Sequence, residues 1–166
     1  MIMKSKIKFL LIILAFFVSG IASAQLTVHK MLHAGYVYQN QSFGEVGGRL
    51  LMLSNDDMIY RLGASALMGS THGEFAIMPK VQGDILFNCE RNVDVSHSYY
   101  ILTGAELTTK YVAPKVGLTL FGLVDITGGY AFSIDKKGLN GKELKGFNFS
   151  FTINIPTVMI HDLFKK

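Results

Sequence analysis

The stretch Phe147-Asn-Phe-Ser-Phe-Thr-Ile-Asn-Ile155 alternates between apolar and polar side chains without a break. Successive side chains of an extended chain point to opposite faces, so a period of two indicates a β-strand with one apolar and one polar face. A helix would instead repeat its apolar residues every three or four positions. This segment therefore predicts a strand whose two faces meet different surroundings.

The same period recurs upstream, and helical periodicity is absent over any long stretch. It predicts eight strands, near residues 27–39, 43–54, 58–69, 72–87, 97–108, 110–121, 123–134 and 145–155. Most links are short and rich in turn residues, so sequential strands form antiparallel hairpins. We expect an all-β protein, a closed antiparallel up-and-down β-barrel of about eight strands, as one domain over residues 25–166. Pro79 and Pro114 fall inside these strands and should each mark a bulge or a strand end.

Residues 1–24 have the layout of a secretory signal peptide. A basic start is followed by ten apolar residues, Phe9–Val18, and then by the small residues Ala22 and Ala24 before a cleavage site at Gln25. The apolar run is too short for a transmembrane helix, which needs about 20 residues. An uncleaved membrane anchor is the alternative. We therefore expect an exported protein.

The composition restricts the function classes. The chain has 166 residues, of which 49% are hydrophobic and 17% charged, with a net charge of +4. The hydrophobic share excludes intrinsic disorder. Three of the positive charges belong to the predicted signal peptide, so the mature chain is close to neutral and nucleic acid is not an expected partner. Cys89 is the single cysteine, which excludes an intrachain disulfide.

Two kinds of barrel fit the alternation. A soluble ligand-binding barrel, periplasmic or secreted, would bury the apolar face, whereas an outer-membrane barrel would turn it toward lipid and keep polar groups inside. The polar face carries small residues that would leave room in a narrow lumen: Gly35, Gly47, Gly63, Ala76, Gly104, Gly117, Gly129 and Ala131. It also carries a nearly balanced set of charges: Glu45, Arg49, Arg61, Glu74, Lys80, Asp84, Glu106, Lys115 and Asp125.

Buried charges need partners, and a water-facing surface has no such requirement, so the balance favours a closed polar lumen. We therefore expect the charged set to form a lumen network. The opposite face is then the lipid-facing one. It contains Phe75, Ile77, Val81, Val116, Leu118, Leu120, Ile126, Tyr130, Phe132, Phe147, Phe149, Phe151 and Ile153.

The stretch Glu106-Leu-Thr-Thr-Lys-Tyr-Val-Ala-Pro-Lys-Val-Gly-Leu-Thr-Leu-Phe121, with Gly128-Gly-Tyr-Ala-Phe132, resembles small outer-membrane β-barrel proteins of Gram-negative bacteria. The resemblance implies the barrel-assembly machinery as a partner, and we also expect contact with outer-membrane lipids and a monomer. Such proteins usually end on an aromatic residue in the last strand. Here Lys165 and Lys166 follow Phe164, so Phe151 is the candidate for an internal version of that signal.

Candidate chemistry is sparse. His29 and His33 share one strand face, but two imidazoles about 13 Å apart along a strand do not make a metal site. His72 with Ser70 is the one pair that an enzyme could use, and no catalytic or cofactor motif accompanies it. We expect no enzyme, metal or cofactor, and a structural or surface-interaction role with outward loops such as 135–144. The alternatives are a minor pore and a lipid-modifying outer-membrane enzyme.

Overall fold

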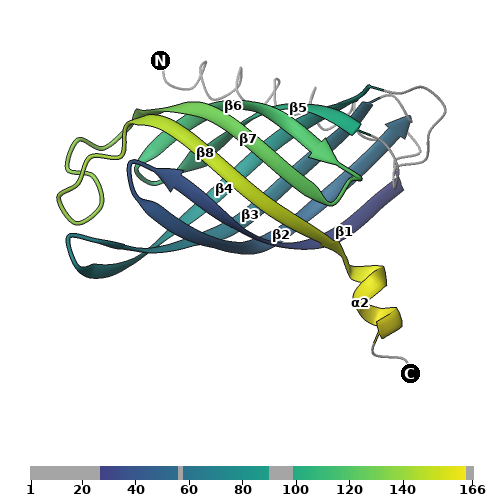
Figure 1. The fold of residues 1–166 in the computed structure, drawn as a ribbon, viewed down its shortest axis with the longest axis horizontal. Coiled ribbons are helices and arrows are strands. Elements are labelled where there is room, and N and C mark those ends of the chain that lie inside the picture. Colours follow the sequence, from purple (N-terminus) through teal and green to yellow (C-terminus); the bar gives the residue numbers. More distant parts are fainter. Residues whose placement is uncertain (1–26, 56–57, 90–98, 164–166) are drawn as a thin grey trace, which may run out of the picture.

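The computed structural model describes residues 27–55, 58–89 and 99–163 (Figure 1). The predicted signal peptide and its cleavage residues Ala22, Ala24 and Gln25 lie outside these ranges. Eight strands and a short terminal helix make up the described chain. They are β1 (Thr27–Gln39), β2 (Ser42–Asn55), β3 (Met58–Thr71), β4 (Glu74–Asn88), β5 (Tyr99–Thr108), β6 (Tyr111–Leu120), β7 (Val124–Ser133), β8 (Gly146–Pro156) and α2 (Thr157–Leu163).

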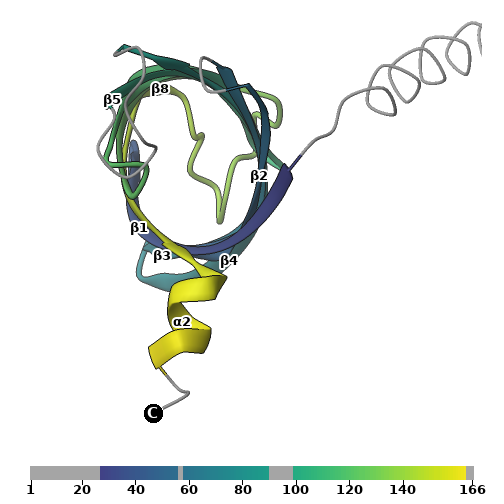
Figure 2. The same cartoon turned by 90° about the vertical axis from the view of Figure 1, so that its right-hand side faces the viewer.

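The strands form one closed barrel in sequence order. Every neighbouring pair is antiparallel, and β1 pairs with β8 to close the ring, which is seen end-on in Figure 2. The predicted all-β, eight-stranded up-and-down barrel is confirmed, with strand ends within about two residues of those expected. Closure leaves no unpaired edge strand, so the backbone groups of all eight strands can be satisfied within the sheet.

The register sets the tilt of the strands. A path that starts at Val28 and follows paired residues through all eight strands returns to β1 at Tyr38, ten residues further along. In an eight-stranded barrel this stagger corresponds to a tilt of about 40°. A strand of ten residues, such as β6 (Tyr111–Leu120), then spans about 25 Å along the barrel axis.

The barrel has two unlike ends. We call the end where β1 begins and β8 runs into α2 the terminal end, and the opposite end the hairpin end (Figure 1). The hairpin end carries the tight turns after β1, β3 and β5 and the longer loop between β7 and β8. At the terminal end, α2 contacts β1 and β8, and the Thr157 hydroxyl donates to the Lys30 carbonyl at 3.1 Å. No helix in the described residues is long and apolar enough to cross a membrane.

Neither proline ends a strand or shifts the register, so neither expected outcome, a bulge or a strand end, is found. β4 continues through Pro79 paired with Ala66 of β3, and its pairing with β5 begins one residue later, at Lys80. At Pro114 the β6–β7 ladder is interrupted between Val112 and Lys115, while the pairing of Pro114 with β5 continues. Each proline therefore lies where the ladder on one side is missing, because proline has no N–H to donate.

The loop between β7 and β8 turns inward across the hairpin end, as Figure 2 shows. Leu139 and Leu144 are buried in it, at 9% and 0% exposed. They pack in one cluster with Val37, Phe43, Leu67, Ala76, Met78, Tyr111, Ala113 and Ala131 of the barrel wall. The loop 135–144, expected to face outward, is thus anchored over the barrel end by these two leucines, while Lys136, Lys137 and Asn140 remain exposed. The two leucines of this otherwise polar loop pack against the inward-pointing apolar residues at the hairpin end of the barrel.

Candidate functional site

The outer face of the barrel is apolar around its whole circumference. Among the outward positions of the described strands, Lys30 is the single charged residue. The residues predicted to be lipid-facing all point outward. Phe75, Val116 and Phe147 are more than 60% exposed, whereas Leu120 and Phe149 are half-buried between neighbouring side chains. A contiguous apolar belt of this size far exceeds the few hundred Å² that a soluble monomer usually exposes.

The tyrosines of this outer face lie at two levels. Tyr60 and Tyr99 lie where β3 and β5 begin, at the terminal end. Tyr36, Tyr38 and Tyr130 lie toward the hairpin end, where Tyr130 contacts Phe132 with ring centroids 5.1 Å apart. Between the two levels the outer face carries mainly aliphatic and small side chains. Aromatic residues flanking an apolar band are typical of barrels that span membranes.

The lumen holds eight of the nine charged residues predicted for it. Four acids and four bases are buried, each at most 4% exposed: Glu45, Arg49, Arg61, Lys80, Asp84, Glu106, Lys115 and Asp125. Glu74 is the exception, because it is exposed. It shares the inward parity of β4 with Lys80, but it is the first residue after the β3–β4 turn and so lies at the outer limit of the barrel.

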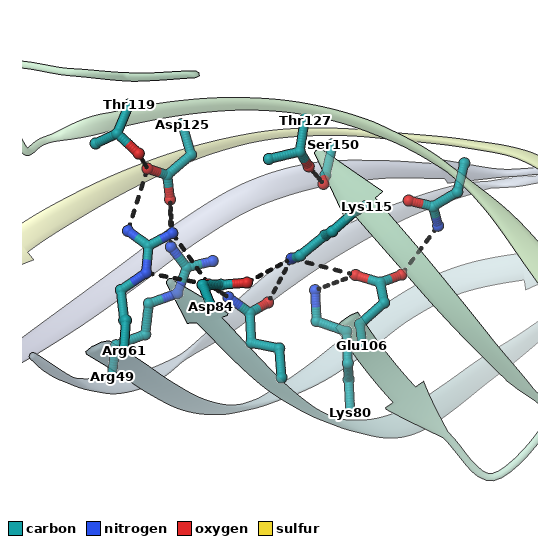
Figure 3. A network of polar contacts seen from close by, with 12 residues as sticks. Arg49, Arg61, Lys80, Asp84, Glu106, Lys115, Thr119, Asp125, Thr127 and Ser150 are labelled. Carbon is teal, nitrogen blue, oxygen red and sulfur yellow. Dashed lines mark hydrogen bonds and ion pairs between the residues drawn. The ribbon is translucent and has the colours of Figure 1, made fainter. Parts of the chain in front are cut away.

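In the terminal half of the lumen, two arginines and two aspartates form one cluster (Figure 3). Arg61 contacts Asp84 at 3.1 Å and Asp125 at 2.9 Å. Arg49 reaches Asp125 from β2, on the other side of the lumen. Thr119 and Asn154 add hydrogen bonds to the Asp125 carboxylate at 2.8 and 3.0 Å. Asp125 therefore joins β2, β3, β6 and β8 to β7.

In the hairpin half, one lysine lies between two glutamates. The Lys80 ammonium is 2.7 Å from Glu45 and 3.2 Å from Glu106. His33 of β1 contacts the same Glu45 oxygen at 3.0 Å. The Lys115 ammonium lies 3.7 Å from both Asp84 and Glu106, so it connects the two halves into one network (Figure 3).

Neutral side chains complete the network, and most of them were not assigned to it from the sequence. The Tyr111 hydroxyl donates to Glu106 at 2.9 Å, and the Asn148 amide donates to the same oxygen at 2.9 Å. Ser65 donates to Glu45 at 2.7 Å. The alternation of β8 had placed Asn148 on the polar face, but the sequence gives no signal for which charge it meets.

Apolar side chains close the lumen at both ends of this network. At the hairpin end the cluster described above lies over it, capped by Leu139 and Leu144. At the terminal end Ile59, Leu86 and Tyr100 are at most 2% exposed and pack with Leu51 and Leu53. The network is thus enclosed by strands around it and by apolar layers above and below. Charged hydrogen bonds strengthen in such surroundings, because the local dielectric is low.

The inward-pointing glycines allow the barrel to be narrow. The sequence predicted that they leave room for the charged side chains, and this holds for only some of them. A Cβ at Gly47, Gly117 or Gly129 would come closer than 3.0 Å to backbone atoms of the neighbouring strand. At Gly104 it would meet both the Gly83 backbone carbonyl and the Asp84 carboxylate, and at Gly63 it would meet the side chains of Arg49 and Gln82. Most inward glycines therefore let the strands bend toward one another, while Gly63, and in part Gly104, leaves room for the network.

The hairpin rim has polar contacts of its own. The Lys110 ammonium lies 2.7 Å from the Asp135 carboxylate, and the backbone N–H of Lys137 donates to the same group. These hydrogen bonds hold the pKa of Asp135 below its usual value. Lys110 belongs to the β5–β6 turn, so this pair ties the start of the β7–β8 loop to the neighbouring hairpin.

The histidines are dispersed. His29 is exposed, His33 is buried beside Glu45, and His72 lies in the β3–β4 turn, where its Nδ1 contacts the Asn140 carbonyl at 2.9 Å. Ser70 is exposed near the end of β3. Within residues 27–55, 58–89 and 99–163, no three His, Cys, Asp or Glu side chains are grouped to hold a metal ion.

No family model matches the sequence, and no curated protein matches it significantly. The functional assignment therefore depends on the barrel's two faces and its rim.

Proposed function

We propose that the protein is an exported outer-membrane β-barrel of a Gram-negative bacterium, a monomer with a filled lumen and a structural or surface-interaction role. One observation carries the proposal. The eight strands present a single outward charge, Lys30, while eight charged residues are buried inside. This distribution is the reverse of a water-soluble barrel and matches one that is surrounded by lipid.

The dimensions support the same proposal. Strands of ten residues at a tilt of about 40° span about 25 Å, which is the height of the apolar band on transmembrane barrels. The two tyrosine levels lie near the limits of this span. Insertion would require the barrel-assembly machinery, and the outer face would then contact outer-membrane lipids.

The filled lumen favours a scaffold over a pore. An eight-stranded barrel is only just wide enough for its own side chains. Here those side chains are ion-paired across the lumen, and apolar clusters cover both ends. Conduction would require breaking several buried ion pairs together. We therefore expect negligible single-channel conductance in a planar bilayer, and steady ohmic conductance would overturn the filled-lumen proposal.

A charge on the belt tests the membrane assignment. Val116 is 63% exposed in the middle of β6. In lipid, Val116→Arg costs about 2–4 kcal/mol and should reduce the heat-modifiable folded form recovered in the outer-membrane fraction. In a soluble barrel, the same change at an exposed position would be neutral within about 0.5 kcal/mol.

Thr109→Arg is the matched control, because Thr109 is exposed in the β5–β6 turn, outside the belt. It should assemble normally. If Val116→Arg assembles as well as Thr109→Arg, or if salt or carbonate alone extracts the wild-type protein, the membrane assignment is overturned.

A further inference from the structure

A pocket of about 570 Å³ lies at the hairpin end, beside the loop that caps the lumen. Its walls come from the β1–β2 turn, the β3–β4 turn, the end of β7 and the β7–β8 loop. The residues that matter here are Asn40, His72, Tyr130, Lys142, Glu143 and Lys145. The pocket opens to the outside and is separate from the ion-paired lumen.

The pocket walls are fixed by contacts between these segments. His72 Nδ1 meets the Asn140 carbonyl at 2.9 Å, and the Asn40 amide donates to the Glu143 carbonyl at 3.4 Å. Beneath them Leu144 is fully buried in the apolar cap. The loop is therefore held in place from both sides, so the pocket does not require the loop to fold around a ligand.

The charged side chains of the pocket form no ion pair among the described residues. Lys142 donates to the neutral Gln41 amide oxygen at 2.8 Å. Among the described residues, no carboxylate lies within 4.0 Å of the Lys142 or Lys145 ammonium, and the Glu143 carboxylate has no ion-pair partner either. The pocket thus offers two cationic donors for a phosphate and one acceptor for hydroxyl groups.

Tyr130 places the pocket relative to the proposed membrane. It lines the pocket and is also part of the outer tyrosine level at the hairpin end, where lipid headgroups would lie. We propose that this pocket binds the phosphate of a hydroxyl-bearing lipid headgroup in the leaflet at the hairpin end. The lysines bind the phosphate and Glu143 accepts from the hydroxyls. The inference rests on the proposed membrane location.

The test measures lipid binding by the folded full-length mature barrel in non-ionic detergent, using native mass spectrometry. Phosphatidylglycerol is the probe with a phosphate and free hydroxyls, and phosphatidylcholine is the zwitterionic comparison. The Lys142→Gln/Lys145→Gln variant should bind phosphatidylglycerol about 25-fold more weakly, since each lysine near a lipid surface contributes about a five-fold factor. Lys136→Gln/Lys137→Gln removes the same charge from exposed loop positions outside the pocket lining and should change binding less than two-fold.

Equal losses in the two variants would mean unspecific attraction and would overturn the site, as would unchanged binding in the lysine-pocket variant. Unaltered heat-modifiable migration of both variants shows that folding is intact. Glycerol 3-phosphate tests whether the bound phosphate belongs to a lipid or to a soluble molecule. If it binds as tightly as phosphatidylglycerol, the proposal that the ligand is a lipid is overturned.

The two proposals can fail separately. A membrane-embedded protein without selectivity for phosphatidylglycerol overturns only the pocket inference. A wild-type protein that salt extracts from membranes, yet binds glycerol 3-phosphate through Lys142 and Lys145, overturns the membrane function and the lipid source.

Discussion

Replacement of Arg61 by methionine tests whether the lumen network is a buried structural element. Arg61 is 2% exposed and is the one base that contacts both Asp84 and Asp125. Methionine keeps most of the side-chain length but removes the charge. Leaving a buried carboxylate without its partner typically costs about 3–5 kcal/mol. Both aspartates keep other partners, Arg49 for Asp125 and Gln82 for Asp84, so we expect about 3 kcal/mol.

The assay is equilibrium unfolding in guanidinium chloride, with the folded protein in detergent micelles. The chain has no tryptophan, so far-ultraviolet circular dichroism and the gel shift between folded and unfolded forms report the transition. Lys110→Met is the control. It breaks the Lys110–Asp135 pair, whose side chains are 25% and 36% exposed, and should lower the free energy of unfolding much less than Arg61→Met does, because solvent screens the pair.

A loss for Arg61→Met no larger than that for Lys110→Met would refute the reasoning, because it would mean that water reaches the lumen and screens the charges. A further variant checks the cause of the loss. Adding Asp84→Asn to Arg61→Met restores the charge balance and should recover part of the stability, since one of the two carboxylates no longer needs a partner.

Two further changes separate the roles of glycines and of the loop. Gly117→Ala should lower the free energy of unfolding by about 1–3 kcal/mol, because its Cβ would collide with the backbone of β7. A Cβ at Gly128 on β7 would meet open space, so Gly128→Ala should be neutral or should raise the free energy of unfolding by up to about 1 kcal/mol. If the two alanine variants lose equal stability in guanidinium unfolding, strand bending is not the cause of the loss. Leu144→Ala should weaken loop docking by about 2–5 kcal/mol and so accelerate trypsin cleavage at the loop lysines, while the gel shift of the barrel remains; an unchanged cleavage rate would mean that Leu144 does not hold the loop.

Strand positions were predictable from the sequence because each strand meets two different surroundings. In β8, every second residue from Phe147 to Ile155 points outward, and Asn148, Ser150 and Asn154 point inward with at most 3% exposure. The same parity identified eight of the nine lumen charges. It failed at Glu74 because parity tells which way a side chain points, but not whether the strand at that level still encloses a lumen.

The ends of the lumen were harder to predict. Val37, Phe43, Leu67 and Met78 point inward although they are apolar, so near the hairpin end both strand faces are apolar and the alternation weakens. The pattern from one strand then gives no sign of an apolar cap. The docking of Leu139 and Leu144 depends on residues from several strands meeting in space, which local periodicity does not report. Which charged residues pair with one another in the lumen network could not be predicted for the same reason, because it also depends on residues from several strands that meet in space.

The network has a task that the sheet hydrogen bonds do not perform. Each ladder joins only adjacent strands, whereas Arg49–Asp125 joins β2 to β7 and Lys80–Glu45 joins β4 to β2. If the outer face contacts lipid, burial of that face does not favour the closed shape over an open sheet in the same lipid. A one-residue slip of any strand from β2 to β7 would move its lumen charges to the outer face and leave their partners unpaired. The ion pairs therefore select both the register and the closure, and the inward glycines make this possible by letting the strands bend into a barrel narrow enough for opposite walls to touch.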